Sequence, residues 1–569
     1  MDKELLISFE NFGFKYTAQA EPTLFDINLK IHRGEKVLIA GPSGCGKSTL
    51  AHCINGLIPN SFPGETSGSL TIKGKDALKL GIFGLSKTVG TVLQDSDAQF
   101  VGLTVAEDIA FALENDCIPD AKLHEEVRRI AKLVDVERVL NHAPHEISGG
   151  QKQRVGLGGV MVNDVDVLLF DEPLANLDPA TGKQTIALID EIQKRSGCAV
   201  IIIEHRIEDV LYCPVDRVVL MGEGRIHFDG DPDTLLAGEL LARFGIREPL
   251  YITALKYAGV KLDSSMKLSQ LSRLKLSDAQ KAQVREWFEA MPKQEAEVPG
   301  EVLLSIQELD FSYESGHHAI KGISTNIHKG EMLSIVGTNG AGKSTFSKLV
   351  CGFKTAQKGH MEFAGEDMSV LSIKERADRI GYVMQNPNQM ISKVQIYDEV
   401  ALGLRCRGFD EDEIRVKVED TLRTCGLYPF RNWPVSALSY GQKKRVTIAS
   451  ILALGVEMII LDEPTAGQDL RHYTEIMDFL SELNSKGVTV LLITHDMHLM
   501  LEYTPRALVF DEGRIIADMT APEVLNSPEI IEKAHLKETS LYPLCTLCGI
   551  PDPVDFTRRF IRRDREVRS

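Results

Sequence analysis

The chain has 569 residues, of which 43% are hydrophobic and 25% charged, and its formal net charge is −17. This length exceeds what a single hydrophobic core organises, and the composition is typical of a globular protein. The acidic balance argues against a nucleic-acid partner held by general electrostatics, because phosphate contacts need Lys and Arg. No apolar run of about 18 residues predicts a membrane-spanning helix, and the first residues lack a secretory signal pattern.

Each half of the chain opens with a predicted strand, then a second strand, a glycine-rich loop and a helix. The loops read GPSGCGKST in residues 41–49 and GTNGAGKST in residues 337–345. In this context the glycines let backbone N–H groups approach phosphates, and the helix N-terminus adds its positive end. In each loop the lysine should reach the β- and γ-phosphates, and the serine after it should bind Mg²⁺. The predicted phosphate-binding residues are Gly41, Pro42, Ser43, Gly44, Cys45, Gly46, Lys47, Ser48 and Thr49 in the first half and Gly337, Thr338, Asn339, Gly340, Ala341, Gly342, Lys343, Ser344 and Thr345 in the second.

Apolar runs later in each half predict a parallel sheet that is buried on both faces. Charged stretches with apolar residues at helical spacing, such as residues 123–140 and 411–427, precede them and predict helices. The runs cover residues 165–170, 198–203, 457–461 and 488–493.

Two adjacent acids end one of these strands in each half, Asp171 and Glu172 in VLLFDEP and Asp462 and Glu463 in IILDEP. The first acid can hold Mg²⁺ directly or through water. The second is placed to polarise an attacking water as a general base. Solvated acids at a strand end would not explain the same pair in both halves, so we predict a hydrolytic site in each.

A third motif lies between the glycine loop and the acidic pair, as ISGGQKQR in residues 147–154 and LSYGQKKR in residues 438–445. The combination resembles the motif set of ATP-binding cassette (ABC) proteins, once per half and over nearly the whole chain. The resemblance implies an α/β fold of two tandem ABC ATPase domains. Each would have a P-loop NTPase, RecA-like core, a helical subdomain with the signature, and a small antiparallel β region. It also implies transport-coupled ATP hydrolysis, with ATP and Mg²⁺ bound.

The resemblance further implies an intramolecular dimer of the two cassettes. The halves would close head to tail, so that the signature of one completes the ATP site of the other. Tyr440 stands where the signature usually has its first glycine, and a tyrosine gives close backbone approach less readily. We therefore expect two competent sites that this residue can make unequal. The predicted signature contacts to the γ-phosphate are Ser148, Gly149, Gly150 and Gln151 from the first half and Ser439, Gly441 and Gln442 from the second.

Other positions also match this family. An aromatic residue would stack on adenine, and a Q-loop glutamine would contact Mg²⁺ and water and sense the membrane partner. A D-loop aspartate would cross the dimer, and a switch histidine would join the two glutamates as a catalytic residue. These positions are Tyr16 and Tyr313 for adenine, Gln94 and Gln385 for the Q-loop, Asp178 and Asp469 for the D-loop, and His205 and His495 for the switch.

Residues 94–115 resemble the Q-loop region of energy-coupling factor (ECF) importers, and residues 385–404 match it more loosely. The implied chain is both ATPase subunits of such an importer fused in tandem, at the cytoplasmic face of the membrane. Its implied partners are a membrane coupling subunit docked near Gln94 and Gln385 and a small substrate-binding membrane subunit. Cargo in that group is vitamins, their precursors, or nickel and cobalt ions. A tandem sugar-import ATPase and a soluble twin-cassette translation factor are the alternatives.

The predicted domain limits follow the internal repeat. The Arg-rich end of the chain, residues 558–568, is expected to be a solvated tail, with contact to lipid headgroups or the membrane partner as the alternative. Cys545 and Cys548 form a CxxC that aligns with apolar positions of the first half, so we expect packing rather than half a metal site. The limits are 1–245 for the first cassette, 246–290 for its C-terminal extension, 291–300 for the linker, 301–535 for the second cassette and 536–569 for its extension.

Overall fold

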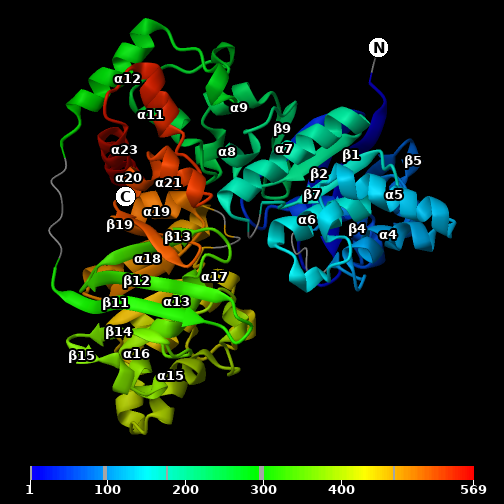
Figure 1. Ribbon diagram of the computed structural model, residues 1–569. Helices are drawn as coiled ribbons and strands as arrows, with labels where there is room; N and C mark the ends of the chain where they lie inside the picture. Colours follow the sequence, from blue (N-terminus) through cyan, green and yellow to red (C-terminus); the bar gives the residue numbers. More distant parts are fainter. Residues whose placement is uncertain are drawn as a thin grey trace. The chain divides into compact units, whose positions relative to one another are not determined.

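The computed structural model describes residues 3–93, 99–174, 177–293, 300–465, 468 and 470–568. The chain divides into two compact units, Met1–Val284 and Arg285–Ser569, and each is described by itself (Figure 1). The division falls inside helix α12 (Asp278–Ala290), ahead of the linker predicted over residues 291–300. The finer domain limits stay a prediction.

The described part of unit 1 contains two sheets. The six-stranded sheet has the order β10 (Arg225–Gly230), β9 (Arg217–Gly222), β3 (Lys36–Ala40), β8 (Ala199–Ile203), β7 (Val167–Asp171), β6 (Val89–Val92). Strands β9, β3, β8, β7 and β6 are mutually parallel, and every residue of β3 and β8 is buried, as expected for a sheet covered on both faces. The antiparallel sheet has the order β2 (Leu24–His32), β1 (Leu5–Tyr16), β4 (Gly64–Ile72), β5 (Lys75–Asp76).

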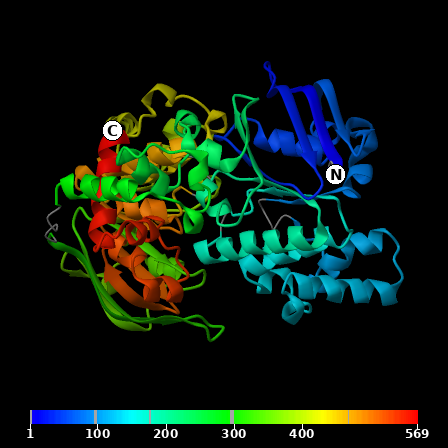
Figure 2. The ribbon, with the colours of Figure 1, turned by 90° about the horizontal axis from the view of Figure 1, so that it is seen from above.

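The helices of unit 1 include a group, α4 to α6, that packs together away from the antiparallel sheet; Figure 2 shows these cyan helices and the blue strands on different sides of the unit. Thr104 and Glu107 form a capping box that begins α4. The predicted helix over residues 123–140 is wrong at its end, because α5 stops at Leu133 and Asp135 adopts a left-handed φ of 57°. The helices are α1 (Lys47–Ile54), α2 (Leu57–Asn60), α3 (Ala77–Ser86), α4 (Val105–Asn115), α5 (Asp120–Leu133), α6 (Gly149–Met161), α7 (Pro179–Ser196), α8 (Ile207–Val210), α9 (Pro232–Ala237), α10 (Leu240–Arg243) and α11 (Leu250–Tyr257).

Unit 2 repeats this architecture. Its six-stranded sheet has the order β16 (Ile380–Val383), β17 (Met458–Asp462), β18 (Thr489–Ile493), β13 (Met332–Gly337), β19 (Arg506–Asp511), β20 (Arg514–Met519). Its antiparallel sheet has the order β12 (His318–His328), β11 (Val302–Ser312), β14 (Lys358–Phe363), β15 (Glu366–Asp367), and Figure 1 shows the first three strands side by side in green. The helices are α13 (Lys343–Val350), α14 (Ile373–Ala377), α15 (Ile396–Cys406), α16 (Glu411–Thr424), α17 (Tyr440–Leu452), α18 (Leu470–Ser485), α19 (Met497–Tyr503), α20 (Ala521–Leu525), α21 (Pro528–Lys533), α22 (Leu541–Cys548) and α23 (Pro553–Arg568).

The Arg-rich end of the chain is the helix α23, so the expectation of a solvated tail is wrong. Phe556 and Phe560 on this helix are fully buried, and Arg559 donates a hydrogen bond of 2.8 Å to the carbonyl of Met291. The guanidinium of Arg559 also lies 4.7 Å from the ring centre of Phe288. Apolar residues at helical spacing therefore fasten the chain end to the unit.

The CxxC lies on α22, where both thiols are buried. Burial raises the pKa of the Cys545 thiol, as expected for a packing cysteine. Within the described residues, no helix combines the length and the apolar character needed to cross a bilayer.

Candidate active site

Each glycine loop lies between the central strand of its parallel sheet and the helix that follows, β3 and α1 in unit 1 and β13 and α13 in unit 2. Gly46 and Gly342 are the N-caps, with φ of 105° and 102°, and no side chain caps either helix. The first-turn N–H groups and the positive helix end therefore face the loop. A Cβ at Gly337 would lie 2.0 Å from the carbonyl oxygen of Phe510, and one at Gly41 would lie 2.5 Å from that of Met221, so only glycine fits there.

The loop lysines lie across their own loops. Lys47 Nζ donates to the carbonyls of Gly41 and Pro42, both at 2.9 Å. Lys343 Nζ donates to two carbonyls of its loop, both at 2.8 Å. Both ammonium groups are buried at the loop centre, whereas the serines that follow them, Ser48 and Ser344, are exposed. Each unit thus brings together the side chains predicted for its phosphate loop.

The two tyrosines predicted to stack on adenine occupy equivalent places. The hydroxyl of Tyr16 lies 3.0 Å from Oγ1 of Thr49, and that of Tyr313 lies 3.0 Å from Oγ1 of Thr345. Each tyrosine is therefore fixed beside the last residue of its phosphate loop, with part of its ring exposed.

The second acid of each pair has an unusual backbone conformation. Glu172 and Glu463 have φ of 49° and 46°, in the left-handed region that non-glycine residues rarely adopt. Their N–H groups donate to the carbonyls of Ile203 and Ile493, both at 2.9 Å. Burial and the neighbouring carboxylates raise the pKa of Glu172 to about 7 and that of Glu463 to about 8. A carboxylate with a pKa in this range is suited to accept a proton near neutral pH.

Each switch histidine lies beside the second acid of its own unit, but the contacts differ. In unit 1, His205 Nδ1 is 3.9 Å from Glu172 and 3.1 Å from Glu204. In unit 2, His495 Nε2 is 3.5 Å from Glu463. Glu204 is fully buried and also accepts the backbone N–H of His205 at 2.9 Å. Sequence reasoning missed Glu204, although the difference between IEHR and ITHD was a signal that could have found it.

The first acids have the surroundings of a cation ligand. Within the described residues, Oδ1 of Asp171 is buried without a hydrogen-bond partner. The charge of Lys47, the residue before Ser48, acts on Asp171. Carboxylate and hydroxyl oxygens are the hard ligands that Mg²⁺ prefers. In unit 2, Asp462 accepts a hydrogen bond of 2.8 Å from Tyr382. These residues fit a magnesium ion.

The signature motifs begin helices α6 and α17. Ser148 accepts the N–H of Gln151 at 3.3 Å, while the Gln151 side chain accepts the N–H of Ser148 at 2.9 Å. Ser439 and Gln442 form the same capping box, at 3.3 and 3.0 Å. Since each serine hydroxyl accepts one bond, its own O–H stays available as a donor. The motif therefore fixes a helix N-terminus with donors at its end.

Four other predicted residues have different outcomes. Gln385 follows β16, and its carbonyl accepts bonds from two side chains of α17. Asp178 is the N-cap of α7, where its side chain accepts the N–H of Thr181 at 2.9 Å. Gln94 and Asp469 lie outside the described residues. The predicted pairing of sites across the two halves stays a prediction.

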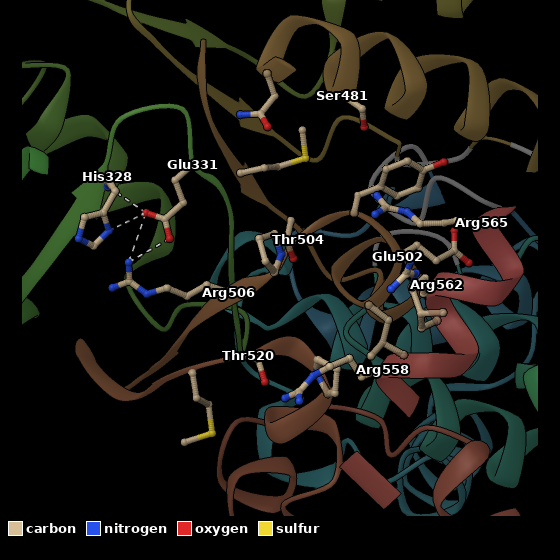
Figure 3. Close-up of a pocket in the computed structure, with 18 of the residues that line it drawn as sticks. His328, Glu331, Ser481, Glu502, Thr504, Arg506, Thr520, Arg558, Arg562 and Arg565 are labelled. Carbon is tan, nitrogen blue, oxygen red and sulfur yellow. Dashed lines mark hydrogen bonds and ion pairs between the residues drawn. The ribbon is translucent and has the colours of Figure 1, made fainter. Parts of the chain in front are cut away.

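A pocket of about 1350 Å³ in unit 2 lies beside α23. Figure 3 shows Arg558, Arg562 and Arg565 on one side of it and the bonded group of Arg506, Glu331 and His328 on the other. Both basic and acidic side chains line this pocket. Among the described residues, none of the predicted site residues lines it. The phosphate loops remain the predicted site. Other acids of the lining are Glu502, Asp518, Glu523 and Glu566.

Comparisons with known proteins identify the family of the chain. Residues 24–175 and 320–466 match the ABC transporter family, and residues 238–311 match a family described as ATP-binding cassette cobalt transporter. The chain is 57% identical over 569 residues, 100% of both proteins, to a putative ABC transporter ATP-binding protein of Clostridium perfringens. It is 55% identical over 567 residues, again 100% of both, to one of Enterococcus faecalis. The solved structure of CbiO1 from Clostridium perfringens, part of the ABC transporter complex cbiONQ, is 36% identical with a TM-score of 0.39, covering 41% of this chain and 94% of that one.

The family matches cover both halves and confirm the prediction of two tandem cassettes. They also confirm the predicted activity, since both cassettes carry the glycine loop and the acidic pair. The chain therefore belongs to the ATP-binding, ATP-hydrolysing subunits of ABC transporters.

Proposed function

We propose that the chain powers an importer of the ECF type, which takes up a vitamin, a vitamin precursor, or nickel or cobalt ions. The observation that carries the proposal is the match of residues 238–311 to a family described as ATP-binding cassette cobalt transporter. This segment includes the end of the first half, which the sequence repeat relates to the end of the second. A soluble translation factor would instead need a charged helical linker and a basic face.

In this proposal the two halves close head to tail on two ATP molecules. Lys47 and Lys343 bind the β- and γ-phosphates, and Ser48, Asp171 and Gln94 or their second-half counterparts hold Mg²⁺, which supplies charge neutralisation on the phosphates. Glu172 and Glu463 accept the proton of the attacking water. The second-half counterparts are Ser344, Asp462 and Gln385.

The signature of each half would then serve the nucleotide of the other. Ser439, Gly441 and Gln442 donate to the ATP held by Lys47, and Ser148, Gly150 and Gln151 donate to the ATP held by Lys343. The outward donors of the capped α6 and α17 N-termini support this assignment.

The membrane coupling subunit is proposed to dock beside the two Q-loops. Val101 and Leu103, which follow the first Q-loop, are 62% and 81% exposed, and Val394 after the second is 73% exposed. In each unit, exposed apolar side chains beside the Q-loop support its use as an interaction surface. A small substrate-binding membrane subunit completes the proposed complex at the cytoplasmic face.

The test is co-purification of the chain with a membrane coupling subunit from detergent extracts, followed by ATP-dependent uptake of Co²⁺, Ni²⁺ or vitamins into vesicles. Leu103→Glu and Val394→Glu should abolish both co-purification and uptake. Val370→Glu is the matched control, since Val370 is 78% exposed in the short 3-10 helix Met368–Val370 between β15 and α14. Co-sedimentation with ribosomes instead of a membrane subunit would contradict the proposal.

A further inference from the structure

The signature helix of the second half is bonded directly to the Q-loop of the same half. On α17, the hydroxyl of Tyr440 donates to the carbonyl of Gln385 at 3.1 Å. One turn further, Lys444 Nζ donates to the carbonyls of Met384 and Gln385 at 2.7 and 2.9 Å. Two side chains of one helix therefore hold two consecutive peptide groups at the end of β16.

Lys444 is an interior residue, with 0% of its surface exposed. Lysines are rarely buried unless their charge has partners, because transfer from water is costly. Its hydrogen-bond partners in unit 2 are the two Q-loop carbonyls. A displacement of α17 relative to β16 would break charge-assisted bonds in this interior, so the helix and the Q-loop backbone are expected to move together.

The first half has different residues at the matching positions. Gly149, which has no hydroxyl, matches Tyr440, and Gln153 matches Lys444. The Gln153 side chain donates to the carbonyl of Pro173 and accepts from the hydroxyl of Thr185 at 3.1 Å. Its side chain is thus bonded to the segment after the acidic pair and to α7.

We propose that Tyr440 and Lys444 are positioning residues that couple the two ATP sites through the second half. The inference rests on the proposed head-to-tail closure, in which Ser439 and Gly441 serve the ATP of the first half while Gln385 serves that of the second. When the α17 N-terminus binds nucleotide at the first site, any movement of α17 is passed on by Tyr440 and Lys444. It shifts the backbone of Gln385, which serves the second site. The described bonds of Gln153 differ from those of Lys444, and the proposed coupling runs through the second half.

The kinetic test uses the full chain in two backgrounds. In Glu172→Gln only the second site hydrolyses ATP, and in Glu463→Gln only the first. Tyr440→Phe removes the hydroxyl and keeps the ring. We expect Tyr440→Phe to raise the Mg²⁺ concentration for half-maximal turnover in both backgrounds or in Glu172→Gln alone. The factor of increase should be at least about fivefold larger in Glu172→Gln, which reports the second site, than in Glu463→Gln, which reports the first. A change confined to the first site, an equal change at both, or no change would overturn the inference.

Two matched controls separate the tie from general effects. Tyr428→Phe removes another hydroxyl of the same helical region, which donates to Glu419 at 3.4 Å. Arg445→Gln removes the charge next to Lys444 on the same helix, where Arg445 is bonded to Glu475 of α18. Lys444→Gln instead installs the residue of the first half. The site difference should follow Tyr440→Phe and Lys444→Gln only. If Lys444→Gln does not fold, Tyr440→Phe decides alone.

A second readout needs no turnover. Amide hydrogen exchange of residues 384–390 in the nucleotide-free chain should be at least about fivefold faster in Tyr440→Phe than in Tyr428→Phe. Without the bond from Tyr440, this segment should open locally more often. Equal exchange would overturn the tie. Absence of turnover in both glutamine backgrounds would instead contradict the proposed function, and the exchange result would still decide the tie.

Discussion

Glu172 and Glu463 illustrate how the site is determined at the scale of single residues. Their left-handed backbone costs about 1–3 kcal/mol each for a non-glycine residue, and such strain is characteristic of functional positions. The N–H of each is bonded to the neighbouring parallel strand, which holds the turn in place. The same conformation in both units supports the same role for both carboxylates.

Glu204 should matter to the first site alone. Because this buried carboxylate holds the backbone and the ring of His205, Glu204→Thr, which copies Thr494 of the second half, should lower turnover at the first site about tenfold. The measurement is turnover in the Glu463→Gln background. In the Glu172→Gln background the same change should have little effect, and an equal loss in both would show that Glu204 does not act through His205.

The sequence predicted those residues whose role is set by local spacing and missed those whose role depends on burial. The glycine loops, acidic pairs and histidines follow strands at short, recognisable spacing. Lys444 looks like an ordinary helix-surface lysine in the sequence, and only the packing of α17 on the end of β16 makes it a buried partner of Gln385. Glu204 was missed because its importance depends on burial beside His205.

At the scale of elements, the helices at the site are of two kinds, which differ in whether a side chain caps their N-terminus. The phosphate-loop helices α1 and α13 begin at left-handed glycines without side-chain caps, whereas α6 and α17 begin at a capping box. The first arrangement leaves backbone N–H groups for an anion, and the second fixes the direction of a helix end. Both arrangements were visible in the sequence as GxxxxGK[ST] and Ser-x-x-Gln.

The two signature glycines should differ in their tolerance of a methyl group. A Cβ at Gly150 would lie 2.7 Å from Cγ2 of Thr181, whereas one at Gly441 would have 3.8 Å to its nearest neighbour. Gly441→Ala should be neutral or raise the free energy of unfolding by up to about 1 kcal/mol. The free energy of unfolding of Gly150→Ala should be about 1–3 kcal/mol lower than that of Gly441→Ala, because the added methyl group is crowded by Thr181. Urea unfolding without nucleotide checks this, and Thr181→Ser should restore the Gly150→Ala loss; no restoration would refute the crowding.

The C-terminal helix α23 should contribute strongly to the stability of unit 2. Phe556 is fully buried against Trp287 and Phe288, with ring centres 6.0 and 5.5 Å apart. Phe556→Ala should lower the free energy of unfolding by about 3–5 kcal/mol. Val567→Ala, at a 49% exposed position of the same helix, should change it by less than about 0.5 kcal/mol. Equal urea midpoints for the two variants would contradict the packing of α23.

The sequence did not predict α23 as a packed helix, because its many arginines suggested solvation. The charge masks an apolar face whose phenylalanines lie one turn apart, and Arg559 is buried by bonding to carbonyls of residues 288 and 291. The partner surface is built from the end of α12 and the residues after it, which no local pattern indicates.

At the scale of the whole molecule, the protein is one architecture used twice with local differences. Both units carry the parallel sheet, the antiparallel sheet and the same arrangement of loop lysine, acidic pair and histidine. The differences concern the surroundings of these residues, namely Glu204 in the first unit and Tyr382, Tyr440 and Lys444 in the second. The machinery is therefore duplicated, while its control is expected to be unequal.

Turnover in single and double glutamate variants tests the central claim of two hydrolytic sites most directly. Glu172→Gln and Glu463→Gln should each lower the ATPase rate of the full chain and leave a measurable part of it. The double variant should lose at least about 100-fold, as expected when a general base is removed from every site. If one single variant matched the double variant while the other kept the full rate, only one site would hydrolyse ATP, and the claim would be contradicted.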